Sequence, residues 1–147
     1  MDRTQGTEES KSQPAPSRAR EIARQAYVYG IWLLFASIIV QFFLAGLGAL
    51  DNPTYWVWHV TNASVVGLLP LVLVAVGAFG RVPGRTLWLT AAVFGLVVLQ
   101  SLLIAPYRAA ATGWLRAIAG LHVVNGLFVF WVGLKLLERT DRLSTHP

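Results

Sequence analysis

Four long apolar stretches without a charged side chain constrain this chain more than any other feature. They run from Gln25 to Leu50, from Asn52 to Gly80, from Thr86 to Tyr107 and from Ala117 to Leu134. About 20 apolar residues at 1.5 Å per residue span the roughly 30 Å of hydrocarbon in a bilayer, and each stretch is long enough. A soluble helix carries polar side chains along one face, whereas these stretches are apolar nearly all round. The sequence therefore predicts an all-α integral membrane protein that crosses the bilayer four times.

Turn signals place the boundaries of the four spans. Asp51-Asn52-Pro53 and Gly80-Arg81-Val82-Pro83-Gly84 predict the first two turns, and Pro106 is expected to end the third span. Pro70 lies within the second span and should bend it. The polar, charged N-terminal segment is typical of a disordered tail. We expect spans over about 24–50, 54–79, 85–104 and 113–137, with tails over 1–23 and 139–147.

The distribution of charge predicts the orientation in the membrane. The formal net charge is +5, but the basic residues form no patch that would favour binding to nucleic acid. They precede the first span, separate the second from the third and follow the fourth. The positive-inside rule then places both termini and the central loop in the cytoplasm. Since the chain has no cysteine, disulfides, iron–sulfur clusters and thiolate metal sites are excluded.

An internal repeat relates the two halves of the chain. The segment from Phe35 to Gln41 matches the segment from Phe94 to Gln100, and His59-Val-Thr-Asn62 matches His122-Val-Val-Asn125. Apolar positions match easily by chance, so the paired glutamines and His-x-x-Asn sets carry the repeat. The two helical hairpins share one orientation, and their pseudo-twofold axis should run along the membrane normal. The predicted fold is therefore a four-helix bundle of two pseudo-twofold-related hairpins.

One histidine is buried in each predicted hairpin. His59 and His122 lie in the outer half of the bilayer, where an ionisable side chain is costly and is usually functional. Two opposed imidazoles near a bundle axis suit axial ligation of a haem iron. The second nitrogen of each ring then needs an acceptor, for which Gln41, Gln100 or a backbone carbonyl one turn earlier is available.

Further residues are candidates for contact with a haem. Small side chains would let a flat macrocycle approach the helices, and interfacial side chains at the outer end would meet its propionates. The first group is Gly46, Ala63, Gly95 and Gly126, and the second is Trp58, Tyr107, Arg108 and Arg116. A second interpretation stays open, in which His, Gln and Asn side chains hydrogen-bond the helices together and small residues permit close packing. Interhelical hydrogen bonding is the expected role of Asn62 and Asn125.

The repeated pattern resembles one four-helix half of haem A synthase over about Tyr27 to Leu137. The resemblance rests on Gln41-Phe-Phe-Leu44-Ala-Gly46, His59, Gln100-Ser-Leu-Leu103 and His122. The chain is also similar to an uncharacterised group of small bacterial four-span membrane proteins with the same motifs. This resemblance implies that the two histidines ligate a b-type haem in the bacterial cytoplasmic membrane. Haem A synthesis is not implied, because Val60 replaces the arginine that follows a histidine in that family and a second four-helix half is missing.

The leading hypothesis is a membrane haem b protein with bis-histidine ligation that passes single electrons. Occupation of both axial positions favours electron transfer over oxygenation. Besides the lipid bilayer, we expect as partner a quinone, a redox protein, a larger membrane complex or a second copy of the chain. The rivals are a non-redox accessory subunit of a larger complex and a haem- or quinone-handling enzyme related to haem A synthase. Zinc and copper are disfavoured because two imidazoles alone bind them poorly.

Overall fold

A computed structural model describes residues 17–109 and 112–145. Within this part of the chain every regular element is helical, and four helices are long and apolar enough to cross a membrane. The elements are α1 (Arg18–Leu50), α2 (Tyr55–Phe79), α3 (Gly84–Arg108), α4 (Trp114–Ala117), the 3₁₀ turn η1 (Ile118–Gly120) and α5 (Leu121–Thr145). The prediction of an all-α, multi-pass membrane bundle is confirmed.

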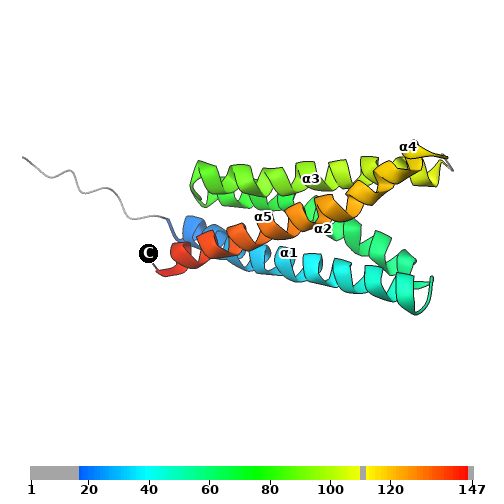
Figure 1. Ribbon diagram of the computed structural model, residues 1–147. Coiled ribbons are helices and arrows are strands. Elements are labelled where there is room, and N and C mark those ends of the chain that lie inside the picture. Colours follow the sequence, from blue (N-terminus) through cyan, green and yellow to red (C-terminus); the bar gives the residue numbers. More distant parts are fainter. Residues whose placement is uncertain (1–16, 110–111, 146–147) are drawn as a thin grey trace, which may run out of the picture.

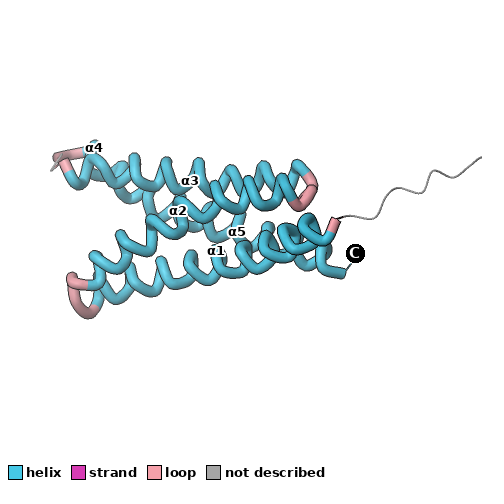
Figure 2. Tube along the Cα trace, turned by 180° about the vertical axis from the view of Figure 1, so that it is seen from behind, coloured by secondary structure: helices cyan, strands magenta, loops and turns pink. Residues whose placement is uncertain are grey.

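The four long helices follow one another around the bundle. Helix α1 packs against α2 and α5, and α3 packs against the same two helices, so α2 lies diagonally opposite α5. Both ends of the described chain and the α2–α3 turn lie at one end of the bundle (Figure 1). The other two connections lie at the opposite end, as the view from behind shows (Figure 2). The pairs α1–α2 and α3–α5 are the two hairpins that the internal repeat predicts.

Two helices are longer than the sequence predicts. Helix α1 begins at Arg18, so residues 18–23, which we expected in a tail, form its first turns. Helix α5 continues to Thr145, well beyond the expected end of the fourth span. Hydropathy cannot detect these extensions because they are polar, although Ala, Arg, Glu and Leu favour helix. Lys135 and Glu138, 2.8 Å apart, form an ion pair one turn apart on α5 near its polar end.

The ends of the third span and the start of the fourth also differ from expectation. Helix α3 runs through Pro106 to Arg108, because a proline in the last turn removes only one backbone donor from the helix. The fourth span begins with α4 and η1 instead of one continuous helix. Gly113, with φ of 62°, makes the sharp turn before α4. Pro70 lies inside α2, and Figure 1 shows that α2 changes direction along its length.

The buried core occupies only one half of the bundle. We call residues 39–50, 55–65, 94–108 and 114–124 the histidine half, and the remainder of the four long helices, together with the α2–α3 turn, the terminal half. Gly48 is the one buried residue of the histidine half among those whose burial is described. The core side chains all lie in the terminal half: Tyr27, Ile31, Leu34, Ile38, Val66, Leu73, Val82, Val93, Val129, Val132, Leu136 and Leu137.

Polar contacts between the hairpins reinforce the terminal half. The buried Tyr27 hydroxyl on α1 donates to Thr90 Oγ1 on α3 at 2.6 Å, since Thr90 itself donates to the Thr86 carbonyl. Arg24 on α1 donates to the Leu143 carbonyl on α5 at 2.8 Å. Satisfied polar groups of this kind hold apolar helices in one relative position.

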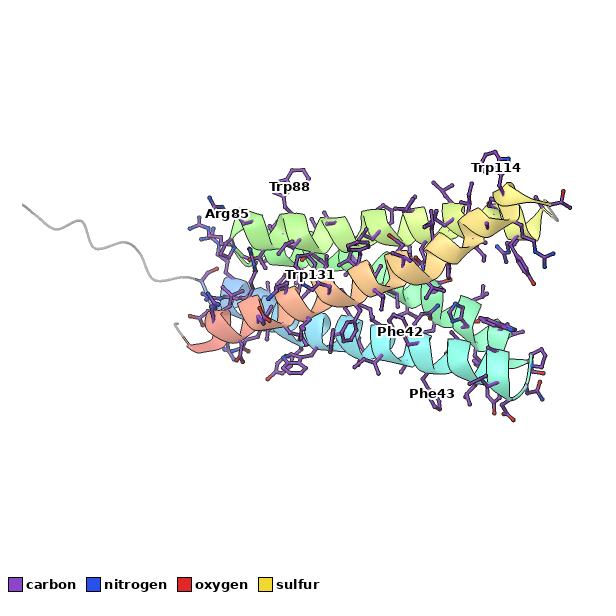
Figure 3. All side chains as sticks on the ribbon, in the orientation of Figure 1. Phe42, Phe43, Arg85, Trp88, Trp114 and Trp131 are labelled. Carbon is purple, nitrogen blue, oxygen red and sulfur yellow. The ribbon has the colours of Figure 1, made fainter. Side chains whose placement is uncertain are left out.

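Large apolar side chains cover the outside of the bundle. Trp88, Trp114 and Phe43 project away from the helices (Figure 3), and each is exposed. A soluble protein rarely exposes so much contiguous apolar surface. The surface is therefore suited to contact with lipid.

Gly80 provides a test of the packing at the terminal half. A Cβ at this position would lie 2.9 Å from the backbone nitrogen of Arg24, and backbone cannot move aside as a flexible side chain can. We expect Gly80→Ala to lower the free energy of unfolding by about 1–3 kcal/mol, the usual cost of overpacking. The matched control is Gly95→Ala, where a Cβ meets no atom within 4 Å. Unfolding of both variants in detergent would measure the difference, and equal stability would contradict the close contact.

Candidate functional site

A hydrogen-bonded cluster joins α1 to α2. The Nδ1 atom of His59 lies 3.1 Å from the carbonyl oxygen of Gln41. Asn62, one turn further along α2, donates from Nδ2 to Oε1 of Gln41 at 2.7 Å and to the Ser37 carbonyl at 2.9 Å. The amide of Asn62 thus uses both of its hydrogens to tie α2 to α1.

An equivalent cluster joins α3 to α5. The Nδ1 atom of His122 lies 3.0 Å from the carbonyl oxygen of Gln100. Asn125 donates to Oε1 of Gln100 and, at 2.8 Å, to the Leu96 carbonyl. Here Gln100 also donates from Nε2 to the His122 carbonyl at 2.8 Å. The internal repeat therefore extends from residue identities to the individual hydrogen bonds.

The glutamines act differently from the expectation that their side chains accept from the histidines. In both hairpins the backbone carbonyl of the glutamine faces the imidazole, while its side chain binds the asparagine. The backbone acceptor expected from the sequence was a carbonyl one turn before the histidine, whereas the carbonyl in the structure belongs to the glutamine of the neighbouring helix. The expected interhelical hydrogen bonds of Asn62 and Asn125 are confirmed.

The carbonyl partners determine which ring nitrogen carries hydrogen. A carbonyl oxygen can only accept, so Nδ1 of His59 and Nδ1 of His122 are the donors. A neutral imidazole then has its free lone pair on Nε2, the nitrogen pointing away from the glutamine. Both rings are half-buried, on the diagonally opposed helices α2 and α5.

The surroundings of the two imidazoles are not identical. Trp56 lies edge-on to His59, with 5.3 Å between the ring centroids. The same indole covers Gly48, where a Cβ would come within 2.9 Å of it. Trp56 is not among the site residues predicted from the sequence. Its position three residues before His59, which puts both on one helix face, was the signal for this contact.

Two of the four small residues lie one turn from the histidines on the side facing the bundle. Ala63 and Gly126 follow His59 and His122 by four residues, so each shares a helix face with its histidine. Gly126 is buried, and a Cβ there would lie 3.5 Å from Cζ of Phe42, which Figure 3 shows between α1 and α5. Gly46 and Gly95 are not packed against a neighbouring helix as Gly126 is. Gly95 is exposed, and a Cβ on Gly46 or Gly95 would meet no atom within 4 Å.

The interfacial residues predicted for the propionate side are only partly brought together. The guanidinium of Arg116 lies over the ring of Tyr107, 5.3 Å from its centroid, as a cation–π pair. This contact ties α4 to the end of α3. Trp58 and Arg108 are exposed, and within the described residues neither forms a hydrogen bond or ring contact with that pair.

The histidine pair has no further metal-binding side chain beside it. In residues 17–109 and 112–145, no group of three His, Cys, Asp or Glu residues is placed to hold a metal ion. His146 lies outside the described residues. The metal-ligating atoms that the described site offers are therefore the two Nε2 atoms of His59 and His122.

Comparison with known proteins assigns no activity to this site. Residues 41–111 match a family of unknown function (DUF6220), which the chain resembles over just under half of its length. The matched range includes Gln41, His59, Asn62 and Gln100, whereas His122 and Asn125 lie beyond it. No curated protein matches the chain, and no solved structure matches it.

Asn125 is expected to contribute measurably to the stability of its hairpin. Asn125→Ala leaves the Leu96 carbonyl and Oε1 of Gln100 without their donor, and should cost about 0.6–2 kcal/mol in the free energy of unfolding. Ser101→Ala is the control, because that exposed hydroxyl bonds only to a carbonyl of its own helix. Chemical unfolding in detergent would compare them. A loss no larger than that of Ser101→Ala would show that the asparagine bond is energetically neutral.

Proposed function

We propose that this protein is a b-type haem protein of the bacterial cytoplasmic membrane that passes single electrons, with His59 and His122 as the two axial ligands. The observation that carries the proposal is the pair of Nδ1 hydrogen bonds to the Gln41 and Gln100 carbonyls. These bonds leave the lone pair of Nε2 in both rings free to ligate a metal, at positions that the internal repeat relates. A metal-ligating histidine usually donates its other nitrogen to just such an acceptor.

The residues around the pair fit a flat macrocycle. The small side chain of Ala63 leaves space on the helix face next to His59, and the histidine half lacks the buried side chains that fill the terminal half. Two imidazoles without a third ligand suit axial ligation of iron in a porphyrin better than a zinc or copper site. When bound, haem supplies a one-electron couple of its iron.

The chain contributes orientation and electrostatics to this chemistry. The carbonyls of Gln41 and Gln100 hold the rings in one tautomer and make Nε2 a stronger donor. Asn62 and Asn125 hold the two glutamines, and Trp56 packs against one ring. With imidazole on both sides, no coordination position remains for oxygen or substrate, which favours electron transfer.

The orientation of the site in the membrane follows from the distribution of positive charge. Both ends of the described chain and the α2–α3 turn lie at the same end of the bundle, and the basic residues of the tails and of that turn would be cytoplasmic. The histidine half then faces the outer leaflet, where Trp58, Tyr107, Arg108 and Arg116 would meet haem propionates. The electron partner would be a quinone, an outer redox protein or a larger membrane complex.

One observation favours a second candidate, a non-redox accessory subunit. Every hydrogen bond of the two clusters lies within a single hairpin, as expected if the His, Gln and Asn side chains only tie helices together. This role predicts a colourless protein. It does not explain why both rings present a free Nε2 on diagonally opposed helices.

Absorbance spectroscopy separates the two candidates. We expect the protein, purified in detergent, to give a reduced-minus-oxidised spectrum of low-spin haem and a pyridine haemochrome of haem b. Carbon monoxide should leave the reduced spectrum unchanged, because both axial positions are taken. A colourless preparation that also fails to bind added haem b would refute the proposal and favour the accessory role.

A further inference from the structure

The shared core and the side-chain hydrogen bonds between the two hairpins lie at one end of the bundle. In the terminal half they share the core, the Tyr27–Thr90 hydrogen bond and the bond from Arg24 to the Leu143 carbonyl. In the histidine half every described side-chain hydrogen bond stays within one hairpin. Gly48 is the one residue of this half that is described as buried, and the side chain covering it is Trp56 of the same hairpin. The hairpins diverge toward this end in both views (Figures 1 and 2).

Each hairpin is tied internally in the half where it is not tied to its neighbour. Helices α1 and α2 are linked by the Gln41–His59–Asn62 bonds and by Trp56 on Gly48. Helices α3 and α5 are linked by the Gln100 bonds to their histidine and asparagine. The histidine ends are therefore two internally linked units, and the packed terminal half joins them.

The histidines lie just beyond the point where the hairpins separate. Phe42 of α1 still reaches α5, where its ring meets Phe130 edge-on at 6.2 Å between centroids and lies close to Gly126. His122 is one turn further out than Gly126, and His59 is one turn further out than Ala63. A ligand held by both rings would thus join the two hairpins at the start of their unlinked ends.

We infer that the α1–α2 and α3–α5 hairpins are two jaws that pivot about the terminal half, and that haem bridging His59 and His122 closes them. The inference rests on the proposed haem binding. It makes the cofactor a structural cross-link: the site is completed by closure, and the histidine ends of the two hairpins keep one fixed separation only when both imidazoles hold the same iron. Loss of either ligand leaves the jaws free.

Distance measurements between spin labels test this directly, since the chain has no cysteine of its own. One labelled pair, Leu50→Cys with Trp114→Cys, reports across the histidine ends of the jaws. The control pair, Tyr29→Cys with Trp88→Cys, reports across the terminal half, and all four side chains are exposed. Pulsed dipolar spectroscopy in lipid nanodiscs would be recorded with and without haem b, and the tip pair repeated in His122→Ala.

We expect haem b to shorten and narrow the tip distances and to leave the control pair unchanged. In His122→Ala the tip distances should stay broad when haem is added. Unchanged tip distances in a protein whose absorbance shows bound low-spin haem would overturn the jaw inference and leave the proposed function standing. An equal shift of the control pair, or closure in His122→Ala, would also overturn it. Absence of a haem spectrum in every sample would instead refute the proposed function.

Discussion

Replacing either His59 or His122 with alanine is expected to abolish the low-spin bis-imidazole haem spectrum. Each substitution removes one Nε2 donor and opens one axial position, so the remaining haem should become high-spin and the reduced form should bind carbon monoxide. The double substitution should lose the haem altogether. Absorbance and electron paramagnetic resonance of the purified variants, with haem quantified per protein, would measure these changes.

The histidine variants should still fold. Each loses one hydrogen bond to a glutamine carbonyl, and interhelical bonds in membrane proteins average about 0.6 kcal/mol. Loss of colour can therefore be separated from loss of structure by circular dichroism on the same samples. His146→Ala is the matched control, because that residue is in the C-terminal segment. If both single variants retained the wild-type spectrum, the ligands would lie elsewhere even though haem was bound.

The fold could be predicted because the property that determines it is local in sequence. Four uncharged runs of sufficient length leave a membrane bundle as the consistent solution, and turn residues such as Pro53 and Gly80 separate them. The errors occur where hydropathy carries no signal. Residues 18–23 carry several charges yet are helical. Pro106 lies in the last turn of α3, although a proline usually indicates the end of a helix.

The candidate site could be predicted in part because it is repeated. Two aligned glutamines and two His-x-x-Asn sets distinguish real correspondence from chance similarity of Val and Leu. The backbone partners could not be predicted, because they depend on the relative height of packed helices. Whether His59 meets the side chain or the carbonyl of Gln41 is decided by a shift of a few ångströms between α1 and α2.

The uneven packing of the bundle was also invisible in the sequence. Leu34 and Leu50 are the same residue type in the same apolar stretch, yet Leu50 is 91% exposed and Leu34 is 1% exposed. Composition cannot separate a side chain that faces lipid from one that faces a neighbouring helix, because the same residues are stable in both places. The separation of a packed terminal half from an open histidine half follows only from the arrangement of the helices.

Ala63→Leu is expected to weaken haem binding strongly without unfolding the protein. Ala63 is one turn inward of His59 on the same face of α2, so a leucine would project into the space proposed for the macrocycle. Overpacking of a well-fitted site costs about 1–3 kcal/mol. Because each 1.4 kcal/mol is a factor of about ten, haem affinity should fall by roughly one to two orders of magnitude. Titration of the protein with haem b, followed by Soret absorbance, would measure the change.

The control for this substitution is Gly95→Leu, which adds a larger side chain at an exposed position where a Cβ meets no atom within 4 Å. The two variants compare Ala63, a small residue one turn from a histidine, with Gly95, a small residue that is exposed. Ala63→Leu should retain the helical content and thermal stability of the parent protein, because the histidine half has no tightly packed core for the added carbons to disrupt. Equal haem affinity in the two variants would place the macrocycle away from Ala63. A stronger effect of Gly95→Leu would move it to the opposite face of α3, where His59 and His122 could not both reach it.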